Sequence, residues 1–141
     1  MPPHKAIGQR AIKDILNARS VTDLSRYFIF PMPTQIGPNL HIYQTPQELA
    51  QGYAALAQAK AQKGQSGFHS RIAAIELPRN NRFRVWVDWL YSDHTGTPRT
   101  GERSIYFCSI LRGQIAVEMI QCAPSAQTTS GLQRSTQPVS A

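Results

Sequence analysis

The sequence has few of the features that would place it outside the ordinary soluble globular proteins. Its two cysteines, Cys108 and Cys122, are too few for a disulfide framework, so we expect two reduced thiols in a cytoplasmic protein. No apolar run approaches the roughly 20 residues needed to cross a bilayer. Residues 1–5 lead into an amphipathic segment, and we therefore expect neither a signal peptide nor a membrane partner.

Acidic residues are also scarce, at 8 against 15 basic ones, which gives a formal net charge of +7. The basic residues are mostly arginines, scattered over turns and strand ends rather than gathered in a helical stripe. The aromatic and basic strand motif of an RNA-binding sheet does not appear. We expect no nucleic-acid partner, whereas a small anionic ligand would suit the charge.

The chain length of 141 residues suits one compact domain. From residue 123 on, the composition shifts to Ser, Thr, Gln, Pro and Gly, which cannot bury an apolar face. The sequence therefore predicts a single domain over residues 1–122 and a disordered tail over residues 123–141.

Three helices are predicted in the first half of the chain. Ile12 and Ile15 belong to the apolar face of a first helix over residues 5–18, and Ser20 begins a capping box for a second over residues 21–28. The third has the clearest start in the chain. Thr45 can cap it, Pro46 suits its first position, and Glu48 can reach back to the cap.

A period of two marks the strands. It runs through residues 83–91, 103–111 and 115–122, while residues 31–38 suit a loop and residues 40–43 a short edge strand. The fold class expected is α+β: a strongly curved antiparallel sheet whose concave face is covered by three N-terminal helices, in the shape of a cone.

The turns set the register expected for the sheet. A turn centred on Asn80 would pair Ile75 with Val85. The longer loop of residues 93–102 would place Phe107 opposite Val87. The face that the helices must cover then collects His69, Arg71, Ala73, Ile75, Leu77, Phe83, Val85, Val87, Trp89, Tyr91, Ile105, Phe107, Ser109, Leu111, Glu118 and Ile120.

The opposite face is too apolar to meet only water, and such a patch usually marks an interface. We expect a homodimer through Trp86, Tyr106, Ile110, Val117 and Met119. The alternative is a different register, because a slip of one residue exchanges the two faces of a strand.

The chain resembles the nuclear transport factor two-like superfamily, which includes scytalone dehydratase, ketosteroid isomerase and polyketide-cyclase-like proteins. Three segments carry the resemblance: residues 27–31, the helix start at residues 45–49 and the hairpin at residues 112–115. It covers residues 5–122. It implies a conical pocket between helices and sheet, a dimer through the outer sheet face, and no cofactor.

The catalytic residues of the isomerases do not carry over to this chain. Phe30 stands where they have an aspartate before a proline, and a position near Phe107 stands where they have a protonated aspartate. Their oxyanion-binding tyrosine lies on the first helix, which has none here. We therefore expect no isomerase activity.

Five side chains remain that could carry chemistry on the concave wall: His69, Arg71, Trp89, Tyr91 and Glu118. Glu118 could act as a general base, with His69 as the acid or Tyr91 as a donor. Alternatively, Glu118 is held by Arg71 or by a group on a helix, because buried charges are usually paired. The residues expected to bind a ligand are Tyr27, Tyr53, His69, Arg71, Trp89, Tyr91, Phe107 and Glu118.

Two functions are open at this point. One is a small-molecule-binding protein, with or without a cofactor-independent lyase, isomerase or cyclase-like activity. The other is a non-catalytic dimeric interaction module whose pocket is filled by its own side chains. The four histidines are dispersed without ligand spacing, so no metal is expected.

Overall fold

The computed structural model describes the backbone of residues 3–123 and the side chains of residues 8–123. The tail expected over residues 123–141 lies outside the described residues, except for Ala123, which ends the last strand. The described residues thus correspond to the single domain expected over residues 1–122.

Three helices precede the last four strands of the sheet, as expected, although its first two strands come before the third helix. They are α1 (Pro3–Asn17), α2 (Val21–Tyr27) and α3 (Pro46–Gln62). The hydroxyl of Ser20 accepts a hydrogen bond from the backbone N–H of Asp23 at 3.1 Å, and that of Thr45 accepts one from Glu48 at 3.2 Å. Both capped starts are confirmed, because these bonds satisfy N–H groups that have no partner within the helix.

One sheet of six strands follows the order β2-β1-β6-β5-β4-β3. The pairing is antiparallel except between β1 and β6. The strands are β1 (Met32–Ile36), β2 (Asn39–Tyr43), β3 (Ser66–Ile75), β4 (Arg82–Ser92), β5 (Pro98–Leu111) and β6 (Gln114–Ala123).

Strand β1 was expected to be a loop because of its prolines, and that expectation is wrong. Pro33 is tolerated because the parallel ladder with β6 begins only at Thr34. A residue without an N–H can therefore sit at the start of the strand, although β1 is an interior strand of the sheet.

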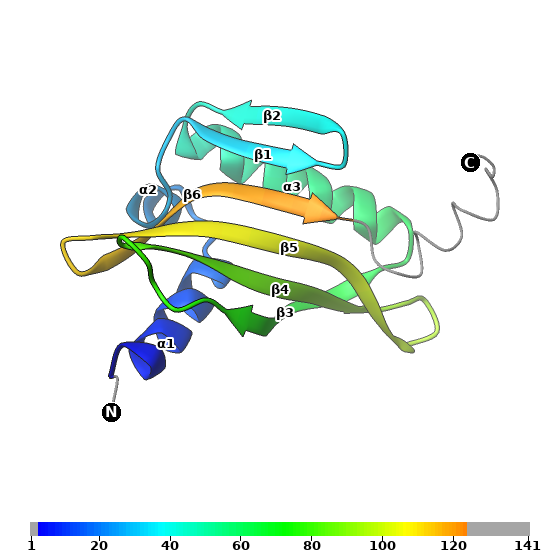
Figure 1. The fold of residues 1–141 in the computed structure, drawn as a ribbon. Helices are drawn as coiled ribbons and strands as arrows, with labels where there is room; N and C mark the ends of the chain where they lie inside the picture. The colour runs from blue at the N-terminus through cyan, green and yellow to red at the C-terminus, as the bar shows by residue number, and fades with distance from the viewer. Residues whose placement is uncertain (1–2, 124–141) are drawn as a thin grey trace.

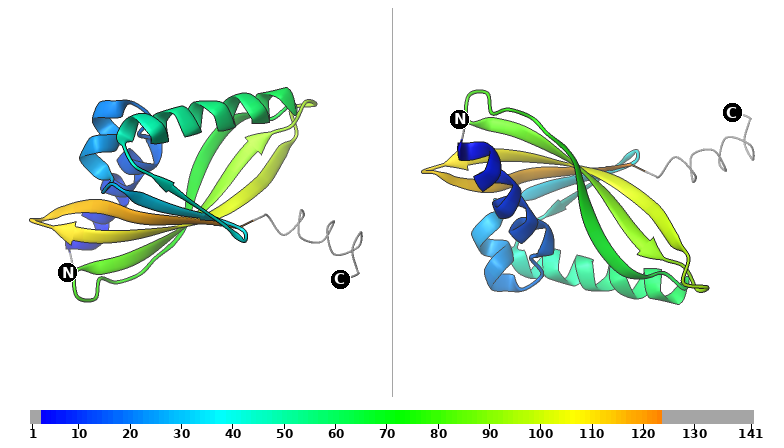
Figure 2. Two further views of the ribbon diagram at one scale, coloured as in Figure 1. Left: turned by 90° about the horizontal axis from the view of Figure 1, so that it is seen from above. Right: turned by 90° about the horizontal axis from the view of Figure 1, so that it is seen from below.

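All three helices lie on one face of the sheet (Figure 1). Strands β3–β5 bend towards the C-terminal end of α3, so that helix and sheet form the two sides of a cone (Figure 2). The side chains buried most completely between them are Leu16, Leu24, Met32, Val85, Val87 and Val117.

Strand β5 has its faces exchanged relative to the expected register. It begins at Pro98, directly after a short turn, and Phe107 therefore pairs with Arg84 instead of Val87. Tyr106 pairs with Val85 and points into the core. Over residues 103–111 the shift covers an odd number of residues, so the side chains of this part of β5 lie on the face opposite to the one expected.

The residues expected to form a dimer contact are corrected accordingly. Tyr106 is 5% exposed and Val117 is 0% exposed, so both belong to the core, and Ile110 packs against it. Trp86 and Met119 do lie on the uncovered face. We call this surface the outer face; its apolar residues are Pro33, Leu40, Ile42, Trp86, Ile105, Phe107 and Met119.

Candidate functional site

His69 and Arg71, expected near the mouth of a pocket, lie on the outer face. A β-bulge between Ile72 and Ala74 adds one residue to β3, and this places Arg71 opposite Asp88. The Arg71 guanidinium donates to the Asp88 carboxylate at 3.1 Å. His69 is exposed, and its Nδ1 lies 3.2 Å from a backbone carbonyl two residues earlier. Both placements on the concave wall were wrong.

Glu118, the expected general base, is also on the outer face. It occupies an irregularity of β6 between the pairs made by Phe107 and Cys108. Its carboxylate accepts hydrogen bonds from Nε and Nη2 of Arg82 at 3.2 and 3.5 Å. Glu118 is therefore held in an ion pair, in line with the alternative, but its partner is Arg82 rather than Arg71 or a group on a helix. Phe107 lies on the same face, so neither residue lines the concave wall.

A surface cavity of about 280 Å³ lies around these residues, lined by Glu76, Arg82, Phe83, Arg84, Phe107, Cys108 and Glu118. Its charges are already paired. The Arg84 guanidinium donates to both carboxylate oxygens of Glu76, at 3.0 and 2.6 Å, and these bonds hold the pKa of Glu76 below its usual range. Paired charges leave this cavity without a free acid or base.

The remaining candidates lie on the concave side or next to it. Tyr53 projects from α3, and Trp89 and Tyr91 project from β4 towards it. Tyr27 instead packs at the end of α2, with the guanidinium of Arg26 5.9 Å from its ring centre. As ligand-binding residues, all four remain predictions.

We give the name concave mouth to one group of residues on the concave side. Its residues come from the α1–α2 junction, α3, β3, β4 and β5: Arg19, Tyr53, Leu56, Lys60, Phe68, Trp89, Tyr91 and Glu102.

The exposure of Leu56 indicates that helix and sheet stand apart here. Residues at spacings of three and four share one helical face, so Leu49, Tyr53, Leu56 and Lys60 all face the sheet. Leu49 is buried, yet Leu56, two turns further along, is 46% exposed. The sheet-facing side of α3 is therefore packed at Leu49 and accessible to solvent at Leu56. Beyond it, the Lys60 side chain is only 18% exposed and contacts the sheet through Glu102.

The deep end of the cone, by contrast, is filled. Val85, Val87 and Val117 have no exposed surface, and Tyr106 is 5% exposed. The phenols of Tyr53 and Tyr106 are close enough to affect each other's pKa. Burial raises the pKa of Tyr53 to about 12 and that of Tyr106 well above its usual value. The protein's own side chains thus occupy the space in which a deep pocket was expected.

Trp89 is held in place by the strands beneath it. Its indole N–H donates to the hydroxyl of Ser104 at 3.2 Å, and that oxygen lies 3.6 Å from the sulfur of Cys122. Both partners point to the concave side from β5 and β6. The ring is therefore fixed as one wall of the concave mouth.

Arg19 was not among the residues expected from the sequence, and neither were Leu56, Lys60, Phe68 and Glu102. Its guanidinium carbon lies 4.3 Å from the centre of the Tyr53 ring and 6.0 Å from that of Trp89. Its Nη1 donates to the carbonyls of Leu16 and Ala18, at 3.0 and 2.6 Å. A basic residue just past a helix end can bind the last carbonyls in this way, and this was the available signal.

A second group closes the far side of the concave mouth. Lys60 forms an ion pair with Glu102 at 3.3 Å, and its ammonium lies 4.7 Å from the centre of the Phe68 ring. Phe68 stacks on Tyr91, with ring centres 5.3 Å apart. The result is an aromatic surface with a neutralised charge pair at its edge.

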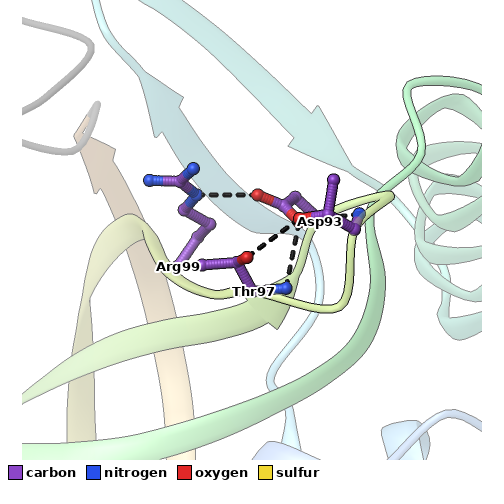
Figure 3. A network of polar contacts seen from close by, with 4 residues as sticks. Asp93, Thr97 and Arg99 are labelled. Carbon is purple, nitrogen blue, oxygen red and sulfur yellow. Dashed lines mark hydrogen bonds and ion pairs between the residues drawn. The ribbon is translucent and has the colours of Figure 1, made fainter.

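The turn between β4 and β5 is built around Asp93 (Figure 3). Its Oδ1 accepts hydrogen bonds from the backbone N–H groups of Thr95 and Thr97, at 2.9 and 3.0 Å, and Oδ2 accepts one from Arg99 at 2.9 Å. The turn touches the end of α3 at Gly64, where an added Cβ would lie 3.1 Å from the Cβ of His94. The Asp93 network therefore fixes the position of the strands relative to α3.

Two further features bear on the chemistry of the described residues. Across this part of the chain, no group of three or more His, Cys, Asp and Glu side chains is placed to hold a metal ion. None of the helices described here is both long and apolar enough to cross a membrane.

No model of a known protein family matches this sequence, and neither does any curated protein. Solved structures do match. A ketosteroid isomerase-like protein from Erwinia carotovora atroseptica has a TM-score of 0.61 at 10% identity, over 89% of this chain and 99% of that one. An NTF-2 like protein of unknown function from Shewanella oneidensis has a TM-score of 0.57 at 13% identity, over 86% and 98% of the two chains.

A third structure, from Nostoc punctiforme, is described as a protein of unknown function with a cystatin-like fold. It has a TM-score of 0.63 at 15% identity, over 89% of this chain and 94% of that one. At these identities the likeness concerns the fold alone, and it agrees with three helices on one face of a curved sheet. The chain has the NTF2-like fold, which is also that of ketosteroid isomerase-like proteins.

Proposed function

We propose that this protein binds a small molecule with a flat apolar body in the concave mouth. The exposure of Leu56 on the sheet-facing side of α3 is the observation that carries the proposal. Across from it, Trp89 and Tyr91 offer aromatic surface, and Arg19, Lys60 and Glu102 place polar groups around it. Apolar walls with a few polar groups are the usual make-up of a small-molecule site.

The chemistry of the concave mouth favours binding over catalysis. A general acid or base works best with a pKa near the operating pH. Tyr53, with a pKa raised to about 12, stays protonated, and the Glu102 carboxylate is paired with Lys60. Glu118 and His69, expected to carry catalysis, lie on the outer face. We also propose that the protein binds its ligand in a reducing compartment such as the cytoplasm, because Cys108 and Cys122 are free thiols.

A second candidate, a dimeric interaction module, is favoured by the outer face. Trp86, Phe107 and Met119 are partly exposed there, and Leu40 and Ile42 extend the apolar surface with 58% and 44% exposure. A contiguous apolar patch of this kind commonly marks a contact with another protein. The filled deep end of the cone also fits this candidate, and the two functions are compatible in one molecule.

The binding proposal can be tested by filling the concave mouth. Bicyclic aromatic fragments would be titrated while backbone and indole N–H shifts are followed by NMR, with Leu56→Trp beside wild type. We expect shifts at Trp89, Tyr91 and the middle of α3, and we expect Leu56→Trp to abolish them. Leu77→Trp is the matched control, because Leu77 is a leucine 74% exposed outside the concave mouth. Shifts confined to the outer cavity around Phe107 would overturn the proposal.

A further inference from the structure

We infer that the ligand of the concave mouth is an anion, with a carboxylate or similar oxyanion bound to Arg19 and its ring against Trp89. The inference rests on the proposed binding function and adds the chemical class of the ligand. It follows from the free edge of one guanidinium, from the way that group is held, and from the balance of charge around it.

The hydrogen bonds of Arg19 leave one edge of its guanidinium unused. Within the described residues, the bonds to the carbonyls of Leu16 and Ala18 both come from Nη1. Nε and Nη2 form the other edge, where two parallel N–H groups match the two oxygens of a carboxylate. No carboxylate in this part of the chain forms an ion pair with Arg19.

The same contacts place the guanidinium before any ligand arrives. Two carbonyls at the end of α1 hold Nη1, and the ring of Tyr53 lies 4.3 Å from the guanidinium carbon. A flexible arginine that binds an anion loses side-chain freedom on binding, whereas one already held in place loses less. Trp89, 6.0 Å from the guanidinium, is fixed by its bond to Ser104 and so is equally ready to receive a ring.

The charges around the concave mouth favour an anion over a cation. Lys60 and Glu102 neutralise each other, which leaves the charge of Arg19 uncompensated within the mouth. Lys13 adds a second positive group at β3: its ammonium donates to the carbonyl of Ser70 at 2.8 Å, and Ser70 pairs with Trp89 across β3 and β4. The positive groups near the indole thus favour an anion.

The test compares two ligands that differ in charge but hardly in shape. 2-Naphthoate and its neutral isostere 2-naphthamide would be titrated into the wild-type protein, with affinities taken from the NMR shifts of concave-mouth residues. A bidentate, charge-assisted contact predicts that naphthoate binds roughly tenfold to a hundredfold more tightly. Equal affinity at the concave mouth would overturn this inference and leave the proposed binding function standing. Absence of shifts there with both ligands would overturn the two together.

Variants of two arginines separate the contact from the overall charge of the protein. Arg19→Gln should abolish the preference for naphthoate, whereas Arg26→Gln should keep it, because Arg26 lies beside the ring of Tyr27 outside the concave mouth. Arg19→Lys keeps the positive charge but lacks the planar guanidinium that binds both carboxylate oxygens, so it should retain part of the preference for naphthoate. It also serves as a second variant in case Arg19→Gln does not fold. An equal loss in the Arg26 and Arg19 variants would show a general charge effect and overturn the inference.

Discussion

The guanidinium of Arg19 lies 4.3 Å from the centre of the Tyr53 ring, and this contact joins the end of α1 to the middle of α3. The phenol of Tyr53 lies in turn close enough to that of Tyr106 of β5 for each to affect the other's pKa. One chain of contacts therefore runs from the first helix, across α3, into the sheet. A ligand bound to Arg19 would touch the same contacts that hold α3 over the sheet.

The outer face predicts a dimer that can be broken by one charge. We expect sedimentation or light scattering to show a dimer at micromolar concentration, and Met119→Arg to shift it to monomer, because an unpaired charge in an apolar contact is costly. Met119 lies beside Phe107 on this face. Val21→Arg is the control, since Val21 is an exposed apolar residue at the start of α2, away from the outer face. A monomeric wild type would remove the reason to treat the outer face as an interface.

The helices could be read from the sequence because their signals are local. Ser20 and Thr45 bind backbone N–H groups a few residues away, so a short stretch of sequence contains both partners. The first hairpin is local as well: the expected pairing of Ile75 with Val85 is present, and Glu76 contacts Arg84. The fold class followed from these elements and from the alternation in the strands.

The candidate site could not be read in the same way, because each face depends on an exact count of residues. The bulge in β3 and the early start of β5 each shift the pairing by an odd number relative to the expected register. Arg71 and Phe107 therefore moved to the outer face together. Arg19 was missed for a different reason. Its partner Tyr53 is distant in sequence, and only the packing of the α1–α2 segment against α3 brings them together.

The hydrogen bonds of Asp93 in the turn between β4 and β5 should make the free energy of unfolding fall at acidic pH. Hydrogen bonds, first from Thr95 and then from Arg99, hold the pKa of Asp93 well below its usual range. A carboxyl with a lowered folded pKa stabilises the protein above its unfolded pKa of about 4, and that contribution is lost as the pH falls through the folded value. Urea unfolding should therefore show Asp93→Asn less stable than wild type at pH 7. The difference should shrink steadily below pH 4 or so. A difference that stays constant as the solution is acidified would contradict this role.

The phenol pair at the base of the concave mouth gives a prediction at neutral pH. Tyr53→Phe removes the hydroxyl that faces the phenol of Tyr106, and Tyr106 is 5% exposed. A buried hydroxyl left without a partner costs about 1–3 kcal/mol, and we expect that loss in the free energy of unfolding. Tyr27→Phe is the matched control, expected to stay within about 0.5 kcal/mol of wild type.

The same pair predicts a response to alkali. Burial raises the pKa of Tyr53 to about 12, so the folded protein keeps this phenol neutral at a pH where the unfolded chain ionises it, near 10. A raised folded pKa means that stability is complete below the unfolded value and falls as the pH rises through the folded one. Unfolding measured at pH 7 and again above 10 should show wild type losing stability, with Tyr53→Phe losing less. Absorbance at the wavelength of tyrosinate should rise late in wild type, and a normal titration of every phenol would contradict the buried pair.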